Sequence, residues 1–249
     1  MGLITSDEFV CFDCETTGLE AHNDRIIEIA IVKFTFNEIL DSYETLVNPE
    51  RPIPEASAQI HHISDEMVAD KPKIGEVLPR VLNMAERAIL VGHGIYLDMQ
   101  FVAEEAKRSS VPCKILSNSY IDTLRMARLY GETPVNSLEK LRQHFNIASE
   151  GAHRAMSDVV VNIEVFKYLS AKFKTTKELT DRLEKPIQLK VMPLGKHKGR
   201  AFSEIPIEYL QWAIHKDFDQ DLMYSLRLEL KKRKQGNQFK QASNPFSNL

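Results

Sequence analysis

Cysteine is scarce in this chain of 249 residues, which contains only Cys11, Cys14 and Cys113. Three cysteines are too few for a framework of disulfide bonds. Cys11 and Cys14 have the spacing of half a zinc or redox site, but residues three apart in a strand point to opposite faces, and the sequence holds no second pair. We therefore expect reduced cysteines and a cytoplasmic protein.

Long apolar runs are also missing. No segment approaches the roughly 18 consecutive apolar residues that suggest a membrane-spanning helix. Residues 1–8 contain no basic segment ahead of an apolar one, so we expect neither a secretory signal nor a membrane partner. The hydrophobic share of 43% and the charged share of 27% are those of an ordinary globular protein, whose length suits one large domain or one and a half.

The formal net charge of −3 is unevenly distributed. Residues 1–184 carry 20 Lys and Arg against 29 Asp and Glu, whereas residues 185–249 carry 12 against 6. The acidic body is consistent with a metal-dependent site, and the basic C-terminal part suggests an anionic partner. The alternative for the basic part is a solvated charged helix.

Two acids follow the first apolar run of the chain. Residues 8–12 predict a buried strand, and alternation along it places Asp13 and Glu15 on the same face. Adjacent carboxylates raise each other's pKa unless a cation lies between them, and Mg²⁺ and Mn²⁺ prefer oxygen ligands. Thr16 to Gly18 then form a turn where the backbone can approach a ligand. The alternative is a solvated strand edge.

The rest of the N-terminal part predicts an α/β fold. The β-prone runs 26–36 and 41–47 suggest an antiparallel meander with the first strand, with Glu28 either hydrogen-bonded or facing outward. A proline-rich loop follows at 48–54. Short strands are expected at 88–91 and 115–121, and helices after Ser64 and at 74–87, 97–109, 122–130, 137–145 and 156–173. This order implies a mixed sheet with helices on both sides.

Two further acids and a histidine stand near the ends of these elements. Asp98 falls in the first turn of one helix, and Asp158 lies early in another. His153 precedes Asp158 by five residues, an offset of about 500° in a helix, so the two would not share a helical face. We therefore place His153 on the loop at Gly151, from which it can reach a metal held by the acids.

Three segments, in this order, resemble the exonuclease motifs of the DEDDh (DnaQ-like) family: Asp13-x-Glu15-Thr16-Thr17-Gly18, Gly92-His93-x4-Asp98 and His153-x4-Asp158. The resemblance covers approximately residues 7–172. It implies a ribonuclease H-like fold and the 3′→5′ hydrolysis of nucleic-acid phosphodiesters with two divalent metal ions, Mg²⁺ or Mn²⁺.

The resemblance also implies a role for each residue that matches a motif. Asp13, Glu15, Asp98 and Asp158 would hold the metal ions, Asp13 bridging them, and His153 would be the general base. The terminal nucleotide would meet the following residues: Thr16, Gly18, Leu19 and His61.

The sequence departs from the family pattern at two places. His62 stands where the family usually has glycine, which suggests a different local turn. Gly94 stands where an asparagine is common, which puts substrate preference in doubt more than catalysis. We expect His93, beside it, to be a structural histidine.

The chain divides into four predicted parts. We expect an exonuclease domain over 1–175, a linker over 176–189, a small, mostly helical basic domain over 190–235 and a disordered tail over 236–249. The loop Gly195 to Arg200 suits phosphate binding, with a plain basic turn as the alternative. Gln241 to Phe246 resembles the clamp-binding peptides of bacterial replication proteins.

The favoured function is a 3′→5′ exonuclease acting on DNA 3′ ends, preferably single-stranded, in proofreading or repair. It would be similar to the epsilon subunits of bacterial DNA polymerase III, with a polymerase or sliding clamp as partner. Free-standing relatives are often dimers, so a homodimer is also expected. The alternatives are an RNA-trimming exonuclease of the same family and a non-catalytic adaptor tethered to a clamp. An aspartyl phosphatase would require Asp-x-Asp, which Glu15 argues against.

Overall fold

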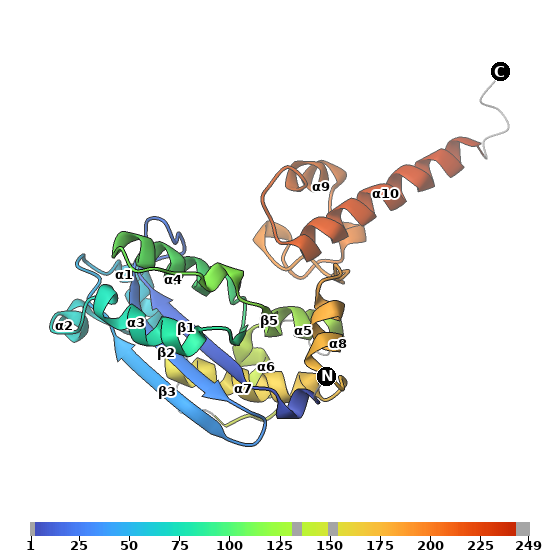
Figure 1. Ribbon diagram of the computed structural model, residues 1–249. Helices are drawn as coiled ribbons and strands as arrows, with labels where there is room; N and C mark the ends of the chain where they lie inside the picture. The colour runs from blue at the N-terminus through green and yellow to red at the C-terminus, as the bar shows by residue number, and fades with distance from the viewer. Residues whose placement is uncertain (1–2, 131–135, 149–153, 243–249) are drawn as a thin grey trace.

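Five strands form one mixed sheet (Figure 1). The structure, a computed structural model, describes residues 3–130, 136–148 and 154–242, with side chains through residue 235. The strand order is β3-β2-β1-β4-β5, in which β1, β2 and β3 are antiparallel and β4 and β5 run parallel to β1. Their bounds are β1 Phe9–Thr16, β2 Ile26–Phe34, β3 Ile39–Leu46, β4 Ile89–Gly92 and β5 Tyr120–Asp122.

Helices cover both faces of this sheet, as the sequence predicted. One face packs against α3 (Ile74–Ala85) and α4 (Tyr96–Arg108), and the other against α5 (Thr123–Tyr130), α6 (Leu138–His144) and α7 (Ala155–Ser170). Alternation along β1 sends Val10 and Phe12 into the first layer, and Phe9 and Cys11 into the second. Asp13 and Glu15 continue the row of Phe9 and Cys11, so they face α7.

Two short helices lie where the sequence predicted one. Helix α1 (Glu55–His61) ends because His62 adopts a left-handed conformation with φ of 58°, and α2 (Asp65–Val68) follows after Ser64. Glycine enters this conformation most easily, which accounts for its usual place in the family pattern. The predicted strand 115–121 also divides, into the 3₁₀ turn η2 (Ile115–Ser117) and β5.

The segment predicted as a linker begins with a helix. Helix α8 (Thr176–Leu183) starts at Thr175, whose hydroxyl accepts a hydrogen bond from the Glu178 amide at 3.1 Å. Leu179 and Leu183 are buried in the same core as α7. The prediction of a linker over 176–189 was therefore wrong for α8, because a surface helix that buries few residues has a polar composition.

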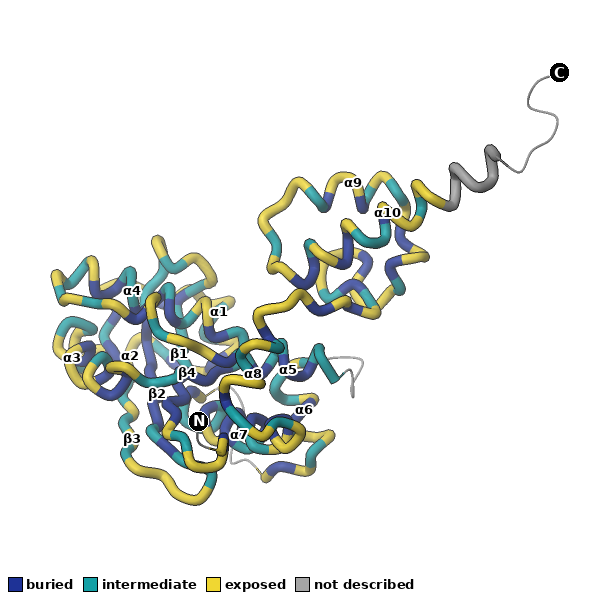
Figure 2. The backbone as a smooth tube through the Cα atoms, turned by 45° about the vertical axis from the view of Figure 1, so that its right-hand side comes forward, coloured by how far each residue is buried: buried dark blue, intermediate teal, exposed yellow. Residues whose placement is uncertain are grey.

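Residues beyond α8 build a second unit with a core of its own (Figure 2). It contains the 3₁₀ turns η3 (Gly195–His197) and η4 (Phe202–Glu204) and the helices α9 (Ile207–Ala213) and α10 (Gln220–Ala242). Its buried core consists of Leu189, Met192, Phe202, Ile205, Leu210, Ala213, Leu222, Leu226 and Leu230. Helix α10 extends through Ala242, whereas the sequence predicted a disordered tail from residue 236.

Ionic contacts join this C-terminal unit to α5. Asp221, fully buried at the start of α10, accepts hydrogen bonds from Arg125 at 3.0 Å and from Arg128 at 3.2 Å. Asp219 also accepts from Arg128, at 3.0 Å. Figure 1 shows the unit beside α5 and α8, with α10 pointing away from the sheet. No helix in the described part of the chain is long and apolar enough to span a membrane.

Candidate active site

Three carboxylates from distant parts of the chain meet where β1 ends. Asp13 and Glu15 lie in β1, and Asp158 lies in the first turn of α7. One carboxylate oxygen from each lies within 4.8 Å of the others, and all three side chains are partly buried. Two of the three acids come from one face of β1, and the third comes from the helix that packs on that face.

The cluster concentrates negative charge away from water. Burial raises the pKa of Asp13, and Asp98, Asp158 and Glu15 raise it further. Burial also raises the pKa of Glu15 to about 7, assisted by Asp158 and Glu28. An oxygen-only donor set with such repulsion suits a hard divalent cation, which would favour the ionised carboxylates.

Asp98 approaches the same strand end from α4. Its Oδ1 accepts a hydrogen bond from the backbone N–H of Cys14 at 3.1 Å. Asp98 therefore lies next to the residue that follows Asp13 in β1. Burial raises the pKa of Asp98 to about 7, although the hydrogen bond from Cys14 opposes this rise. Asp98 is therefore close enough to Asp13 to raise its pKa, but it lies outside the closest group of three.

A buried ion pair supports the start of α7 behind this cluster. The Glu28 carboxylate is 0% exposed and accepts from Arg154 Nε at 3.0 Å, Arg154 Nη2 at 2.6 Å and the Ala155 amide at 3.0 Å. Glu28 is thus hydrogen-bonded, one of the two alternatives from the sequence. Because Asp158 donates its amide to the Arg154 carbonyl at 3.0 Å, this pair holds the turn that carries Asp158.

The turn after β1 packs tightly around Asp24. A side chain at Gly18 would place its Cβ 2.4 Å from Oδ2 of Asp24, so no larger residue fits there without movement. Thr17 donates to Asp24 at 3.2 Å, and Thr16 donates to the Gly18 carbonyl at 2.6 Å. The turn leaves Leu19 80% exposed.

Of two predicted histidines, His61 is buried and His93 is partly buried. His93 lies within hydrogen-bond distance of Thr123 Oγ1 (3.0 Å) and the Asn136 carbonyl (2.9 Å), and burial lowers its pKa to about 4. It is a neutral structural histidine, as expected. His61 accepts from the Ile63 amide through Nδ1 at 3.0 Å, and its Nε2 has no partner among the described residues. His153 lies outside the described residues.

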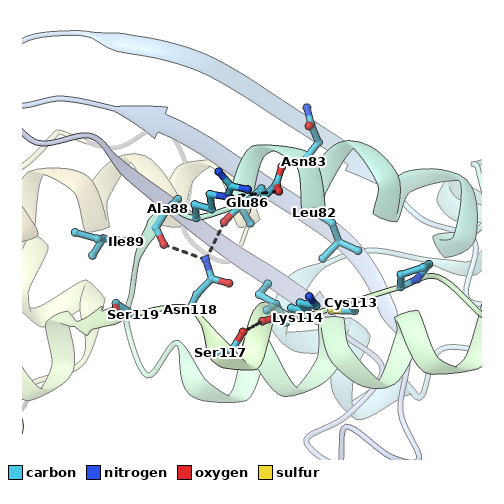
Figure 3. Close-up of a pocket in the computed structure, with 14 residues that line it drawn as sticks. Leu82, Asn83, Glu86, Ala88, Ile89, Cys113, Lys114, Ser117, Asn118 and Ser119 are labelled. Atoms are coloured by element: carbon cyan, nitrogen blue, oxygen red, sulfur yellow. Dashed lines mark hydrogen bonds and ion pairs between the residues drawn. The ribbon is translucent and has the colours of Figure 1, made fainter.

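A cavity of about 950 Å³ lies elsewhere, between the end of α3, the start of β4 and η2 (Figure 3). Ile89 at its wall pairs with Phe9, the first residue of β1, so the cavity is at the opposite end of these strands from Asp13 and Glu15. Asn118 turns toward the backbone there and donates to the carbonyls of Ala85 and Ala88. The amide nitrogen of Asn118 is therefore already hydrogen-bonded to the protein backbone. The acid cluster remains the candidate site.

A family model described as "Exonuclease" matches residues 10–166, the segment that contains the acid cluster. The chain belongs to the exonuclease family. The fold and the resemblance predicted from the sequence are thereby confirmed. Members of this family depend on divalent metal ions, and the exonuclease domain offers three clustered carboxylates for them.

Relatives include replication proteins. The chain is 36% identical over 194 residues to the PolC-type DNA polymerase III of Caldanaerobacter subterraneus, which covers 75% of this chain but only 14% of that protein. It is 35% identical over 167 residues to the DNA polymerase III subunit epsilon of Treponema pallidum, covering 66% of this chain and 76% of the relative. The exonuclease domain is thus similar to a small part of the first protein and to most of the second.

A solved structure has the same fold. Exonuclease X, determined in complex with 5′ overhanging duplex DNA, matches with a TM-score of 0.56 and 25% identity, covering 70% of this chain and 99% of that one. A second family model, "Putative quorum-sensing-regulated virulence factor", matches residues 180–231. This match falls on the C-terminal unit and begins within α8.

The motifs revealed the acids of the exonuclease domain but not their supports. Arg154 directly follows His153, yet nothing in its neighbourhood connects it with Glu28, 126 residues earlier. Asp24 likewise carries no signal beyond a polar turn. The only indication for Glu28 is a carboxylate within an apolar run, which often marks a buried, paired charge.

Proposed function

We propose that this chain is a metal-dependent 3′→5′ exonuclease that removes nucleotides from the 3′ ends of DNA. The observation that carries the proposal is the meeting of Asp13, Glu15 and Asp158 within 4.8 Å in a chain of the exonuclease family. Most of the epsilon subunit of Treponema pallidum is similar to this chain, which supports a role in proofreading or repair.

The acids are assigned as ligands of two divalent ions, Mg²⁺ or Mn²⁺. Asp13 would be a ligand of this group, because Glu15 on its own strand and Asp98 and Asp158 on two helices all lie close enough to raise its pKa. When bound, such ions would supply positive charge to the attacking and leaving oxygens of a phosphodiester. The carboxylates would balance that charge, and their burial keeps the site's dielectric low.

His153 is assigned as the general base. It would take a proton from the attacking water as the water oxygen bonds to phosphorus and the bond from phosphorus to the 3′ oxygen breaks. The products are a nucleoside 5′-monophosphate and a strand shortened by one nucleotide with a free 3′-hydroxyl. The ion pair between Arg154 and Glu28 would hold the chain immediately after His153.

The terminal nucleotide would lie against the turn after β1. Thr16 and Gly18 offer a hydroxyl and backbone beside the acids, and exposed Leu19 would wedge against the last base. His61 would contribute through Nε2, which is buried and unused in the described part of the structure. A single strand suits this arrangement, because the end of a duplex must separate before one terminal base can stack on Leu19.

Partners beyond DNA stay predictions. The epsilon-like relative suggests association with a polymerase. In the segment predicted to bind a sliding clamp, Gln241 and Ala242 end α10, and residues 243–246 lie outside the described residues. The expected homodimer also remains to be tested.

The decisive test is a gel assay on 5′-labelled single strands of DNA and RNA in parallel, with Mg²⁺, Mn²⁺ or EDTA. We expect a ladder that shortens from the 3′ end only when metal is present, with DNA cut faster. Faster cutting of RNA would instead select the RNA-trimming alternative. No cleavage of either strand would overturn the proposal and favour the adaptor.

Matched variants locate the activity. Asp13→Ala and Asp158→Ala are expected to abolish cleavage while preserving the circular dichroism spectrum. Asp70→Ala serves as the control, because Asp70 is an exposed carboxylate just after α2. Normal turnover by either variant of the cluster would refute the assignment of its ligands.

A further inference from the structure

The C-terminal unit contains a cavity of its own, far along the chain from the acid cluster. Its volume is about 700 Å³, and it lies between the basic loop at η3 and the helix α9. Its walls combine aromatic rings with basic groups: Gly195, Lys196, His197, Pro206, Glu208, Tyr209 and Trp212.

Two aromatic rings form one wall. Tyr209 and Trp212 are three residues apart on α9, and their ring centroids are 5.2 Å apart at an interplanar angle of 39°. The indole of Trp212 is 51% exposed, an unusual position for so large an apolar ring. Lys196 Nζ lies 5.0 Å from the centroid of the Tyr209 ring, and Lys216 Nζ lies 4.9 Å from that of Trp212. Each of the two rings therefore has a cation beside it.

A buried histidine whose ring nitrogens have no partner among the described residues lines the cavity. His197 is only 9% exposed, and its ring meets that of Tyr209 edge-to-face at 4.5 Å between centroids. Neither ring nitrogen has a hydrogen-bond partner in the described part of the structure. Buried polar atoms in native proteins are usually paired, so an unpaired imidazole at a cavity suggests a missing ligand.

The loop that carries Lys196 and His197 has a fixed shape. Met192 and Arg200 hydrogen-bond across its base at 2.9 Å, and the Gly199 amide donates to the Met192 carbonyl at 2.8 Å. Gly195 has φ of 70°, and a Cβ there would approach the Tyr209 hydroxyl to 2.9 Å. Glycine thus allows the loop to lie directly against the aromatic wall.

Charge identifies the kind of ligand. Residues 185–249 carry 12 Lys and Arg against 6 Asp and Glu, and Lys196 and Lys216 flank the rings. Glu208 is the carboxylate in the lining, and it is exposed to solvent. Cations beside stackable rings match a chain of phosphates and bases, since every base has a face that stacks on an aromatic ring.

We propose that this cavity binds single-stranded DNA, with a base stacked on Trp212 and its phosphates against Lys196 and Lys216. The choice of DNA rests on the proposed function, but the stacking surface does not depend on catalysis. The contacts of Asp221 with α5 hold the unit at a fixed position beside the exonuclease domain. The strand would therefore be retained by the C-terminal unit while its 3′ end is shortened.

Trp212 is the only tryptophan in the chain, so its fluorescence reports on this cavity alone. The experiment titrates the full chain with oligodeoxythymidylate of about 16 nucleotides, the upper site size for one binding fold. EDTA prevents cleavage. We expect saturable quenching of the tryptophan emission, with an affinity that weakens as salt is added. An oligonucleotide without bases should leave the emission unchanged.

Fluorescence anisotropy of a labelled strand then measures affinity in variants. Trp212→Ala should weaken binding by about 5- to 150-fold, the equivalent of stacking one base. Tyr224→Ala, which removes an exposed ring on α10, should leave it unchanged. Lys196→Ala should make the dependence of log K on log salt shallower by about 0.7. Lys190→Ala removes an exposed lysine outside the lining and is the matched control.

Two results would overturn the proposal. One is tryptophan emission that does not change when anisotropy shows the strand to be bound. The other is equal affinity for Trp212→Ala and Tyr224→Ala. Neither depends on catalysis, because Asp13→Ala should retain the quenching. Failure of the proposed function would appear separately, as absent metal-dependent cleavage.

Discussion

The ion pair between Glu28 and Arg154 allows a quantitative test of how the acid cluster is held. The two members differ in environment, since the side chain of Arg154 is 44% exposed and that of Glu28 is completely buried. The arginine can be solvated if its partner is removed. The carboxylate cannot, and among the described residues it would keep only the Ala155 amide as a donor. The two single substitutions should therefore differ in cost.

Arg154→Ala is expected to lower the free energy of unfolding by about 3–5 kcal/mol, the usual cost of leaving one charge of a buried pair uncompensated. Glu28→Gln keeps the shape and an acceptor for Arg154 and should cost only about 1–3 kcal/mol. The double variant should cost less than the sum of the two, because both substitutions remove the same contact.

Urea unfolding followed by far-ultraviolet circular dichroism measures these differences. The matched control is Arg80→Ala. Arg80 makes two hydrogen bonds of 2.8 Å to Asp41, but both side chains are well exposed, so its loss should cost less than about 1 kcal/mol. Equal costs for Arg154→Ala and Arg80→Ala would refute the reasoning, as would a larger cost for Glu28→Gln than for Arg154→Ala.

A functional readout accompanies the stability measurement. Arg154 lowers the pKa of Glu15, so removing its charge should make Glu15 harder to ionise. The same substitution loosens the first turn of α7, which carries Asp158. Titration calorimetry with Mn²⁺ near neutral pH should therefore show weaker binding by Arg154→Ala and unchanged binding by Arg80→Ala. Unchanged Mn²⁺ affinity in both variants would show that the ion pair does not support the metal site.

Three other perturbations have definite expected outcomes. In EDTA the free energy of unfolding should fall as pH rises through about 7, because Glu15 and Asp98 bind protons more tightly in the folded state than in the unfolded state. Urea titrations at several pH values that show constant or rising stability would contradict this expectation. Asp221→Ala leaves Arg125 of α5 without a carboxylate partner among the described residues and leaves Arg128 with Asp219 alone, so we expect a loss of about 3–5 kcal/mol, checked by urea unfolding, with faster proteolytic release of the C-terminal unit. Unchanged stability and proteolysis would exclude an ionic anchor. Gly18→Ala displaces Asp24 and should lower kcat/KM on single-stranded DNA on the order of tenfold to 100-fold in the gel assay, and wild-type rates would show that the turn does not position the nucleotide.

The sequence predicted the parts of the exonuclease domain that depend on local pattern. Alternation in β1 correctly placed Asp13 and Glu15 on one face, and helical periodicity located α3, α4 and α7 within a few residues. The order of the three motifs predicted the family, which the comparison confirms. These features are predictable because each depends on residues that are close in sequence.

Contacts between distant residues were beyond prediction. Nothing near Glu28 indicates Arg154, and nothing near Asp221 indicates the arginines of α5, because such pairs form only when the elements pack. Helix α8 was missed for a related reason, since only a few of its residues are buried and its composition resembles that of a linker. Its apolar residues Leu179 and Leu183 are buried only because the core around α7 lies against them.

One face of β1 carries apolar residues at its start and acidic residues at its end. The apolar residues account for how the acid cluster is held together. Phe9 packs on Phe166 of α7 with ring centroids 4.9 Å apart, and Cys11 contacts the Val159 carbonyl at 3.8 Å. These contacts hold α7 along β1, so Asp158 must meet Asp13 although both are negative. Repulsion within the cluster is thus offset by apolar packing elsewhere on the same two elements. The acids therefore converge because of the packing of the elements that carry them, and they need no contact with one another.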